Sequence, residues 1–169
     1  MRVYVPLTLP ALATLNSTGE VGPAPLTAYA VTPGLREWYL SGTEEELEYA
    51  AMGRAAQASL RLIAADLEIP PRRVVLAADV ADGTVTPAAD PGLGLDAVTL
   101  GEVRIAGTVP LAKCASVHVD GVDAEPDITA AAEALPAAEA GDEDARFVVD
   151  GAADHELLWY AVQELDSLL

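Results

Sequence analysis

Cysteine is nearly absent from this chain, with Cys114 as the single one in 169 residues. An internal disulfide therefore cannot form, and stability has to come from a hydrophobic core. A chain of this length buries roughly 70% of its unfolded surface, which is enough for such a core. Aromatic residues make up only 5% of the chain, so Ala, Val and Leu have to fill most of the interior. A reducing compartment suits this cysteine usage.

The N-terminal segment MRVYVPLTLP has neither the basic start nor the long apolar stretch of a secretion signal. The longest run without charge, residues 3–19, contains two prolines together with Asn16 and Ser17, so it is not expected to span a bilayer. We therefore expect one cytoplasmic domain over residues 1–169, with no membrane contact.

Basic residues are also few: the chain has 9 Lys and Arg against 27 Asp and Glu, giving a net charge of −18. Residues 79–169 carry 19 of the acidic and 3 of the basic side chains. Such a field repels phosphate backbones, and Arg72 and Arg73 alone make too small a basic patch, so no nucleic-acid binding is expected. The acidic half is either a solvated surface or a docking face for a basic protein partner.

Residues 44–67 carry the clearest helix signal. Thr43 and Glu46 have the spacing of a capping box. The apolar residues that follow recur every three or four positions, on one face of a helix: Leu47, Ala51, Ala55, Ala58, Leu62 and Ala65. Because most of them are alanines, a sheet is expected to pack closely against this helix.

The other segments alternate between strand and helix patterns. Strands are predicted at 2–5, 26–32, 73–80, 102–109, 115–121 and 145–151, and a loop at 81–97. Further helices are predicted at 8–19, 35–42, 125–141 with a disturbance at Pro136, and from Asp154 to the C-terminus. This order favours an α+β fold with a single mixed or antiparallel sheet, helices mainly on one face, and a ferredoxin-like core with additions.

The segment HELLWY raises the question of a metal site. A zinc-protease helix needs a second histidine four residues after the first, and that position holds Trp159. The apolar residues of 157–168 instead predict the buried stripe of a last helix. His155 is then expected in its first turn, at the surface or boundary, or in contact with a ligand or partner.

Other catalytic patterns are equally incomplete. If 115–119 is a strand, Cys114 and His118 share a face but lie about 13 Å apart, too far for a dyad. No serine, Ser116 included, has a patterned partner. The acidic loop after Asp120 departs from the EF-hand pattern, and no glycine-rich phosphate loop is present. We therefore predict no catalytic residues, no metal ligands and no cofactor.

One set of residues mixes aromatic and charged side chains, as anchors of protein interfaces do. We predict an interaction surface there, together with the aromatic pair near the C-terminus: Arg36, Trp38, Tyr39, Glu45, Glu48, Tyr49, His155, Trp159 and Tyr160.

The segments VTPGLREWYLSGTEEELEYAAMGRAAQASLRLIAAD, RRVVLAADV, VHVDG, GDEDARFVV and HELLWYAVQEL resemble an uncharacterised family of small actinobacterial proteins over nearly the whole chain. The resemblance implies a cytoplasmic bacterial protein. It implies no activity, cofactor or site residue.

Our leading hypothesis is a non-enzymatic binding or regulatory protein that self-associates and contacts a protein partner. The alternative is a small hydrolase or transferase with His155 or His118 as its acid–base group. A pocket that joins either histidine to a carboxylate and an aromatic wall would favour the enzyme, and a flat surface would favour binding.

Overall fold

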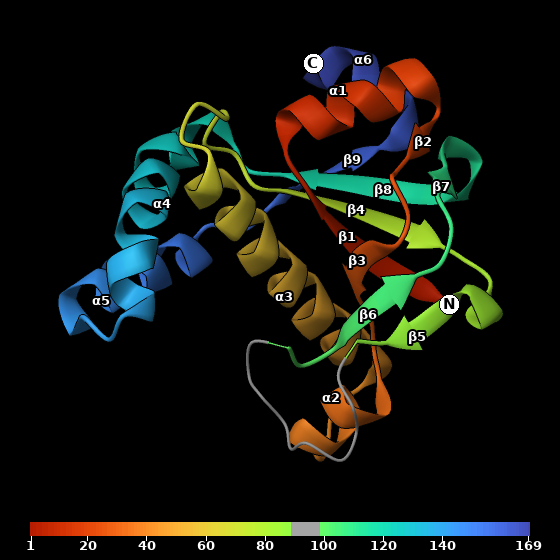
Figure 1. Cartoon of the computed structure of the whole chain (residues 1–169), viewed down its shortest axis with the longest axis horizontal. Coiled ribbons are helices and arrows are strands. Elements are labelled where there is room, and N and C mark those ends of the chain that lie inside the picture. The colour runs from red at the N-terminus through yellow and green to blue at the C-terminus, as the bar shows by residue number, and fades with distance from the viewer. Residues whose placement is uncertain (89–98) are drawn as a thin grey trace.

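A seven-stranded sheet forms the centre of the protein (Figure 1), in the order β5-β6-β3-β1-β4-β8-β9 with every neighbouring pair antiparallel. The structure is a computed structural model that describes residues 1–88 and 99–169. The strands are β1 Arg2–Leu7, β3 Leu26–Tyr29, β4 Val74–Asp79, β5 Val85–Pro87, β6 Glu102–Ile105, β8 Cys114–Val119 and β9 Leu158–Ala161. Two short strands, β2 Glu20–Val21 and β7 Val109–Pro110, pair separately.

The helices lie on both faces of this sheet. They are α1 Leu9–Thr18, α2 Pro33–Trp38, α3 Glu44–Ala65, α4 Glu125–Glu139, α5 Glu143–Gly151 and α6 Leu165–Leu168. The architecture is therefore α+β, as predicted. Of the helices in the described part of the chain, none combines the length and the apolarity needed to cross a bilayer.

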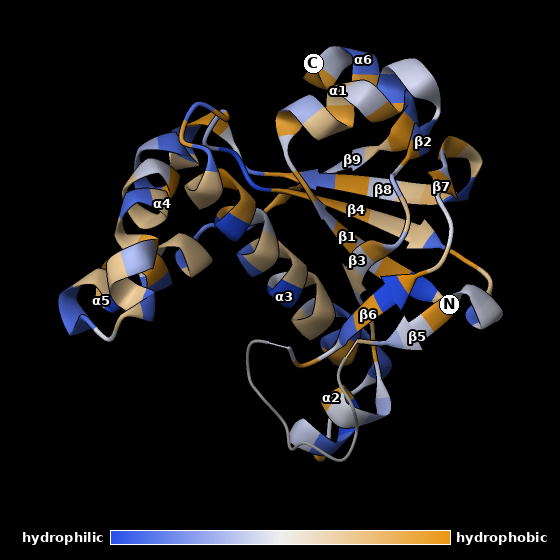
Figure 2. Cartoon of the chain, viewed as in Figure 1, coloured by the Kyte–Doolittle hydropathy of each residue, from blue (hydrophilic) through white to orange (hydrophobic). Residues whose placement is uncertain are grey.

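Alternating residues of each central strand enter two separate cores. Val3 and Val5 pack in the same cluster as Leu12 of α1. Tyr4, between them in sequence, packs in a second cluster with Ala51 and other alanines of α3. These small side chains let the helix approach the sheet, as the sequence predicted. Figure 2 shows apolar residues along most of β4, in the interior of the sheet, and both apolar and polar residues along β8.

Local signals fix the ends of α3, the helix predicted most clearly, and of α1. Thr43 caps α3, and the full capping box with Glu46 is present. The Thr8 hydroxyl accepts a hydrogen bond from the Ala11 amide at the start of α1, and Gly19 ends that helix with a φ of 84°. That left-handed conformation favours glycine. Strand β4 also lies where the sequence placed it.

Strands β3 and β4 are joined through α3 and lie on either side of β1. This is a split β-α-β unit, the element that ferredoxin-like folds share. Helices α4 and α5 pack together as a pair, and α4 also contacts α3. Between α3 and α4 lies a third cluster of buried residues, which includes Ile63 of α3 and Ile128 of α4. Figure 1 shows the pair beside α3, away from β5 and β6.

Two predictions near the C-terminus are wrong. Residues 145–151 are helical, because they belong to α5. Where a last helix was expected, the chain instead forms a 3-10 turn at Ala152–Asp154, an extended segment and strand β9. The short α6 follows near the C-terminus. His155 therefore lies ahead of a strand rather than in the first turn of a helix.

Smaller differences concern boundaries. Strand β1 continues through Pro6 to Leu7, beyond the predicted end at residue 5, and α4 continues through Pro136, where a disturbance was predicted. The strand predicted at 102–109 is two strands, β6 and β7, in different sheets. The loop predicted at 81–97 contains β5, and its residues 89–97 lie outside the described residues.

Candidate functional site

A pocket of about 280 Å³, which we call the aromatic pocket, lies where β1, α3, β8 and β9 meet. It brings together side chains that are up to 157 positions apart, between Arg2 and Trp159. Its walls are the aromatic residues Tyr4, Tyr49 and Trp159, the carboxylates Glu45 and Glu48, and Arg2, Met52, Ala77, Ser116 and His118.

Helix α3 supplies the acidic wall. Glu48 and Tyr49 follow Glu45 by three and four positions, so both lie on the same face of the helix as Glu45. The Thr43 cap fixes where that helix begins, one residue before its first turn. Tyr49 and Trp159 are 61% and 62% exposed, so both aromatic rings are largely open to solvent at the rim.

Strand pairing supplies the opposite wall. Trp159 of β9 lies directly across from His118 of β8 in the register of the two strands. Ser116 and His118, two residues apart on β8, point to the same face. A hydrogen bond of 3.0 Å joins the Ser116 hydroxyl to Nε2 of His118. Burial, and then the positive charge of Arg2, lower the pKa of His118, so its imidazole is neutral at pH 7.

Arg2 does not leave a free positive charge in the pocket. Its guanidinium donates two hydrogen bonds to the Asp79 carboxylate, at 2.8 and 3.1 Å. The hydrogen bond from Arg2 lowers the pKa of Asp79. Burial, and then the negative charge of Glu48, raise the pKa of Tyr4. With Arg2 balanced by Asp79 and His118 neutral, Glu45 and Glu48 give the pocket a net negative charge.

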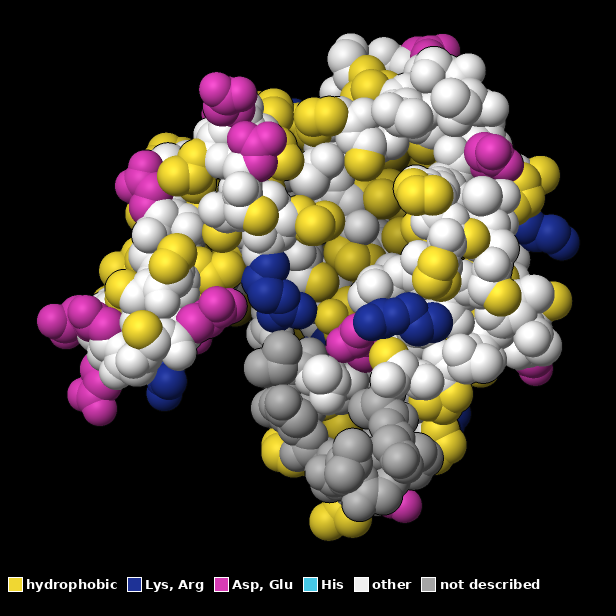
Figure 3. All heavy atoms as spheres, viewed as in Figure 1, with side chains coloured by type: hydrophobic (Ala, Val, Ile, Leu, Met, Phe, Trp, Pro, Cys, Tyr) yellow, Lys and Arg dark blue, Asp and Glu magenta, His cyan; other side chains and the backbone are white. Residues whose placement is uncertain are grey.

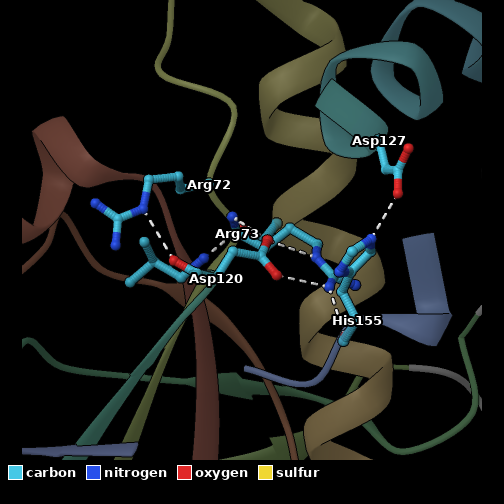
Figure 4. Close-up of polar contacts among 7 residues, drawn as sticks. Arg72, Arg73, Asp120, Asp127 and His155 are labelled. Carbon is cyan, nitrogen blue, oxygen red and sulfur yellow. Dashed lines mark hydrogen bonds and ion pairs between the residues drawn. The ribbon is translucent and has the colours of Figure 1, made fainter. Parts of the chain in front are cut away.

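A buried ion pair holds the segment that leads into β9 (Figure 4). Arg73 binds both carboxylate oxygens of Asp120 at 2.8 Å and also donates to the backbone carbonyl of His155 at 2.9 Å. Arg72 donates to the Asp120 carbonyl. The His155 ring faces Asp127 of α4, with its Nε2 2.6 Å from the Asp127 carboxylate. This network positions β9, and through it Trp159, from outside the aromatic pocket.

The structure brings together four of the nine residues predicted as an interaction surface: Glu45, Glu48, Tyr49 and Trp159. The other five lie elsewhere. Arg36 pairs with Glu44 at 2.8 Å, Trp38 and Tyr39 are exposed at the end of α2, His155 binds Asp127, and Tyr160 packs against the core on the α1 side of the sheet.

Sequence reasoning missed part of the pocket. Ser116 was expected to have no partner, but it bonds to His118. The alternation of the predicted strand was the signal that could have found this pair. Arg2 and Tyr4 had no such signal, because only the order of the strands brings β1 next to β4 and α3.

Cys114 does not share a face with His118, contrary to expectation. The register between β4 and β8 shifts between Ala77 and Ala78, and Cys114 packs against the core on the α1 side. Burial there raises the pKa of its thiol to about 11. Across residues 1–88 and 99–169, no group of three or more His, Cys, Asp or Glu side chains is arranged to hold a metal ion.

The fold and this pocket define a small α+β protein with an acidic, aromatic-lined recess. A family model described as a family of unknown function, DUF6912, matches residues 1–169. The chain belongs to that family. Comparisons with curated proteins and with solved structures give no match.

Proposed function

We propose that this chain is a binding protein that receives a basic side chain of a protein partner in the aromatic pocket. The observation that carries the proposal is the pairing of two carboxylates, Glu45 and Glu48, with the rings of Tyr49 and Trp159 in one recess. Carboxylates attract a lysine or arginine, and aromatic faces hold its cation.

The dimensions and charges of the pocket agree with this class of ligand. A volume of about 280 Å³ suits one long side chain better than a whole cofactor. The exposed rings at the rim, Tyr49 and Trp159, can contact the partner around that side chain. The net charge of −18 would steer a basic partner toward the protein.

The test is a titration of the ¹⁵N-labelled protein with short capped peptides that contain one arginine or one lysine. A peptide with citrulline in place of arginine is the matched neutral control. We expect shifts of amide signals around the pocket with the basic peptides, and weaker binding by about five- to tenfold in Glu48→Gln and Trp159→Ala. Trp38→Ala, at a tryptophan that is also exposed but lies outside the pocket, is the control variant. Equal binding of citrulline and arginine peptides would contradict the proposal.

Acid–base catalysis is a second candidate, and the criterion stated for it from the sequence is met. His118 shares the aromatic pocket with carboxylates, aromatic rings and the Ser116 hydroxyl, and His155 lines another pocket with Asp127 and Phe147. A neutral imidazole could accept the serine proton. However, β8 pairs with β4 and β9 on both sides, so its backbone amides are engaged in the sheet rather than directed at an oxyanion. Labelling of Ser116 by a fluorophosphonate, lost in His118→Gln, would favour this second function over binding.

A further inference from the structure

A second cavity lies away from the aromatic pocket, and we call it the sheet cleft. It has a volume of about 630 Å³ and is lined by residues of β1, β3, α1, α3 and the segment around β2. Figure 3 shows this face hollowed between α1 and α3, with hydrophobic side chains lining the hollow and basic side chains beside it.

The cleft opens because β1 and β3 separate. Strand β1 pairs with β4 over all its residues, but with β3 only at Tyr4 and Tyr29. The backbones of Met1 and Val80 form two hydrogen bonds with each other, as in an antiparallel pair. Because the backbone groups of successive residues point to opposite sides of a strand, those of Tyr4 and Pro6 point toward β3. Pro6 has no N–H to continue the ladder. Helices on opposite faces of the sheet therefore both line the gap, Ala11 from α1 and Ala58 from α3.

The walls of the cleft are mainly apolar. Val5, Leu7, Val21, Leu26 and Leu62 all line it. A cavity of about 300–1,000 Å³ with apolar walls and a few polar groups is typical of small-molecule sites.

One cation faces this apolar space. Arg61 of α3 lines the cleft, is half-buried, and donates a hydrogen bond of 3.2 Å to the Tyr29 hydroxyl, which is a neutral group. The acidic side chains of the lining have other contacts: Glu102 binds Arg104 at 2.6 Å, and Glu20 accepts from Thr108 at the exposed rim. Arg61 is thus placed to bind an anionic group of a ligand.

The geometry points to a second binding site in the sheet cleft, for a small molecule with an apolar body and a carboxylate head that pairs with Arg61. The apolar body would lie between β1 and β3, against the side chains that no strand covers there. This inference does not depend on the proposed function of the aromatic pocket, because the two sites share no lining residue.

The test uses decanoate as the probe, below the concentration at which it forms micelles, with 1-decanol and decylammonium as matched controls. Calorimetry gives the affinities, and contacts between the alkyl chain and the methyl groups of Val5 and Leu26, measured by NMR, give the place. We expect decanoate to bind at least tenfold more tightly than the alcohol, and decylammonium, whose ammonium head suits the acidic aromatic pocket instead, to show no contacts with Val5 and Leu26.

Variants distinguish the contribution of the Arg61 charge to binding from the contribution of the cavity itself. Arg61→Gln should weaken decanoate about tenfold and remove its advantage over decanol. Ala11→Phe, or Thr14→Phe at a more exposed position, should fill the cleft and weaken both probes. Arg54→Gln, on the same helix but outside the cleft, should leave the affinities unchanged. Absence of decanoate binding, equal affinity for decanoate and decanol, or full binding by Arg61→Gln would overturn the inference.

Discussion

Arg73 and Asp120 form an ion pair from which water is almost excluded, at 5% and 0% exposure. Removing one member of such a pair leaves an uncompensated buried charge. We expect Arg73→Met to lower the free energy of unfolding by about 3–5 kcal/mol, measured by urea denaturation.

Arg36 provides the matched comparison for that prediction. Its pair with Glu44 has a similar distance, 2.8 Å, but both side chains are half exposed. Arg36→Met should therefore change the free energy of unfolding by less than about 1 kcal/mol. Similar losses of unfolding free energy in the two variants would show that burial does not determine how much the Arg73–Asp120 pair stabilises the protein.

His118 makes stability depend on pH in a defined window. Its pKa in the folded protein is lower than the unfolded value of 6.5, mainly because of burial. The unfolded state therefore binds the proton first, and the contribution of His118 to stability is complete above pH 6.5 and falls as the pH drops toward the folded pKa. We expect His118→Gln to flatten this part of the stability profile, measured by urea denaturation at a series of pH values.

The carboxylate of Asp79 changes stability in a different range. Arg2 lowers its pKa below 3.8, so its contribution is present above that value and is lost only at more acidic pH. A slope that persists between pH 6.5 and 5 in His118→Gln would therefore have another origin than these two groups, and would contradict the role assigned to His118 burial.

Among the elements, α5 is a helix that includes residues 145–151, which the sequence pattern assigns to a strand. The Asp142 side chain accepts hydrogen bonds from the amides of Asp144 and Ala145, and Glu143 and Asp144 lie in the first turn. We expect Asp142→Ala to destabilise α5 by about 1 kcal/mol, measured as faster amide hydrogen exchange over α5.

Asp142→Asn is the control for that variant. It removes the same charge but keeps an oxygen that can cap the helix, so most of the protection against exchange should remain. Equal acceleration in both variants would mean that the charge near the helix dipole, rather than the cap, stabilises α5.

The elements that the sequence predicted well are those with complete local signals. Helix α3 has its capping box and one continuous apolar face, and β4 is a buried run of apolar residues. Residues 145–151 and 155–169 lack such an unambiguous pattern. The former pack on α4, and LWYA covers the edge of β8, so contacts distant in sequence decide both structures.

At the scale of the whole molecule, the order of the strands creates the two cavities. No local pattern in the sequence predicts that order. The aromatic pocket needs β1 beside β4 and β9 beside β8. The acidic and aromatic residues of α3 and Trp159 could be singled out as candidates, because their chemistry is visible in the sequence. Their meeting with Tyr4 and His118 could not, and neither could the separation of β1 from β3 at Pro6.

Net charge is also a property of the whole molecule, and it opposes folding. With 27 acidic and 9 basic side chains, repulsion among carboxylates is relieved when the chain expands. Exposed ion pairs such as Arg2–Asp79 and Arg36–Glu44 act in the opposite direction, but each contributes no more than about 1 kcal/mol. We therefore expect added salt to stabilise the protein, because it screens the repulsion more than it weakens these pairs.

The measurement is the thermal unfolding midpoint at pH 7.5 between about 0.02 and 0.3 M NaCl, over which the screening length falls from roughly 20 to 6 Å. The midpoint should rise steeply at low salt and then level off. Sodium chloride and sodium perchlorate at equal low ionic strength should act alike, because screening does not depend on the identity of the ion, whereas preferential exclusion from the surface does. A midpoint that falls with salt would mean that the ion pairs outweigh the repulsion, and that the acidic charge lies far enough apart in the folded protein to have little effect on its stability.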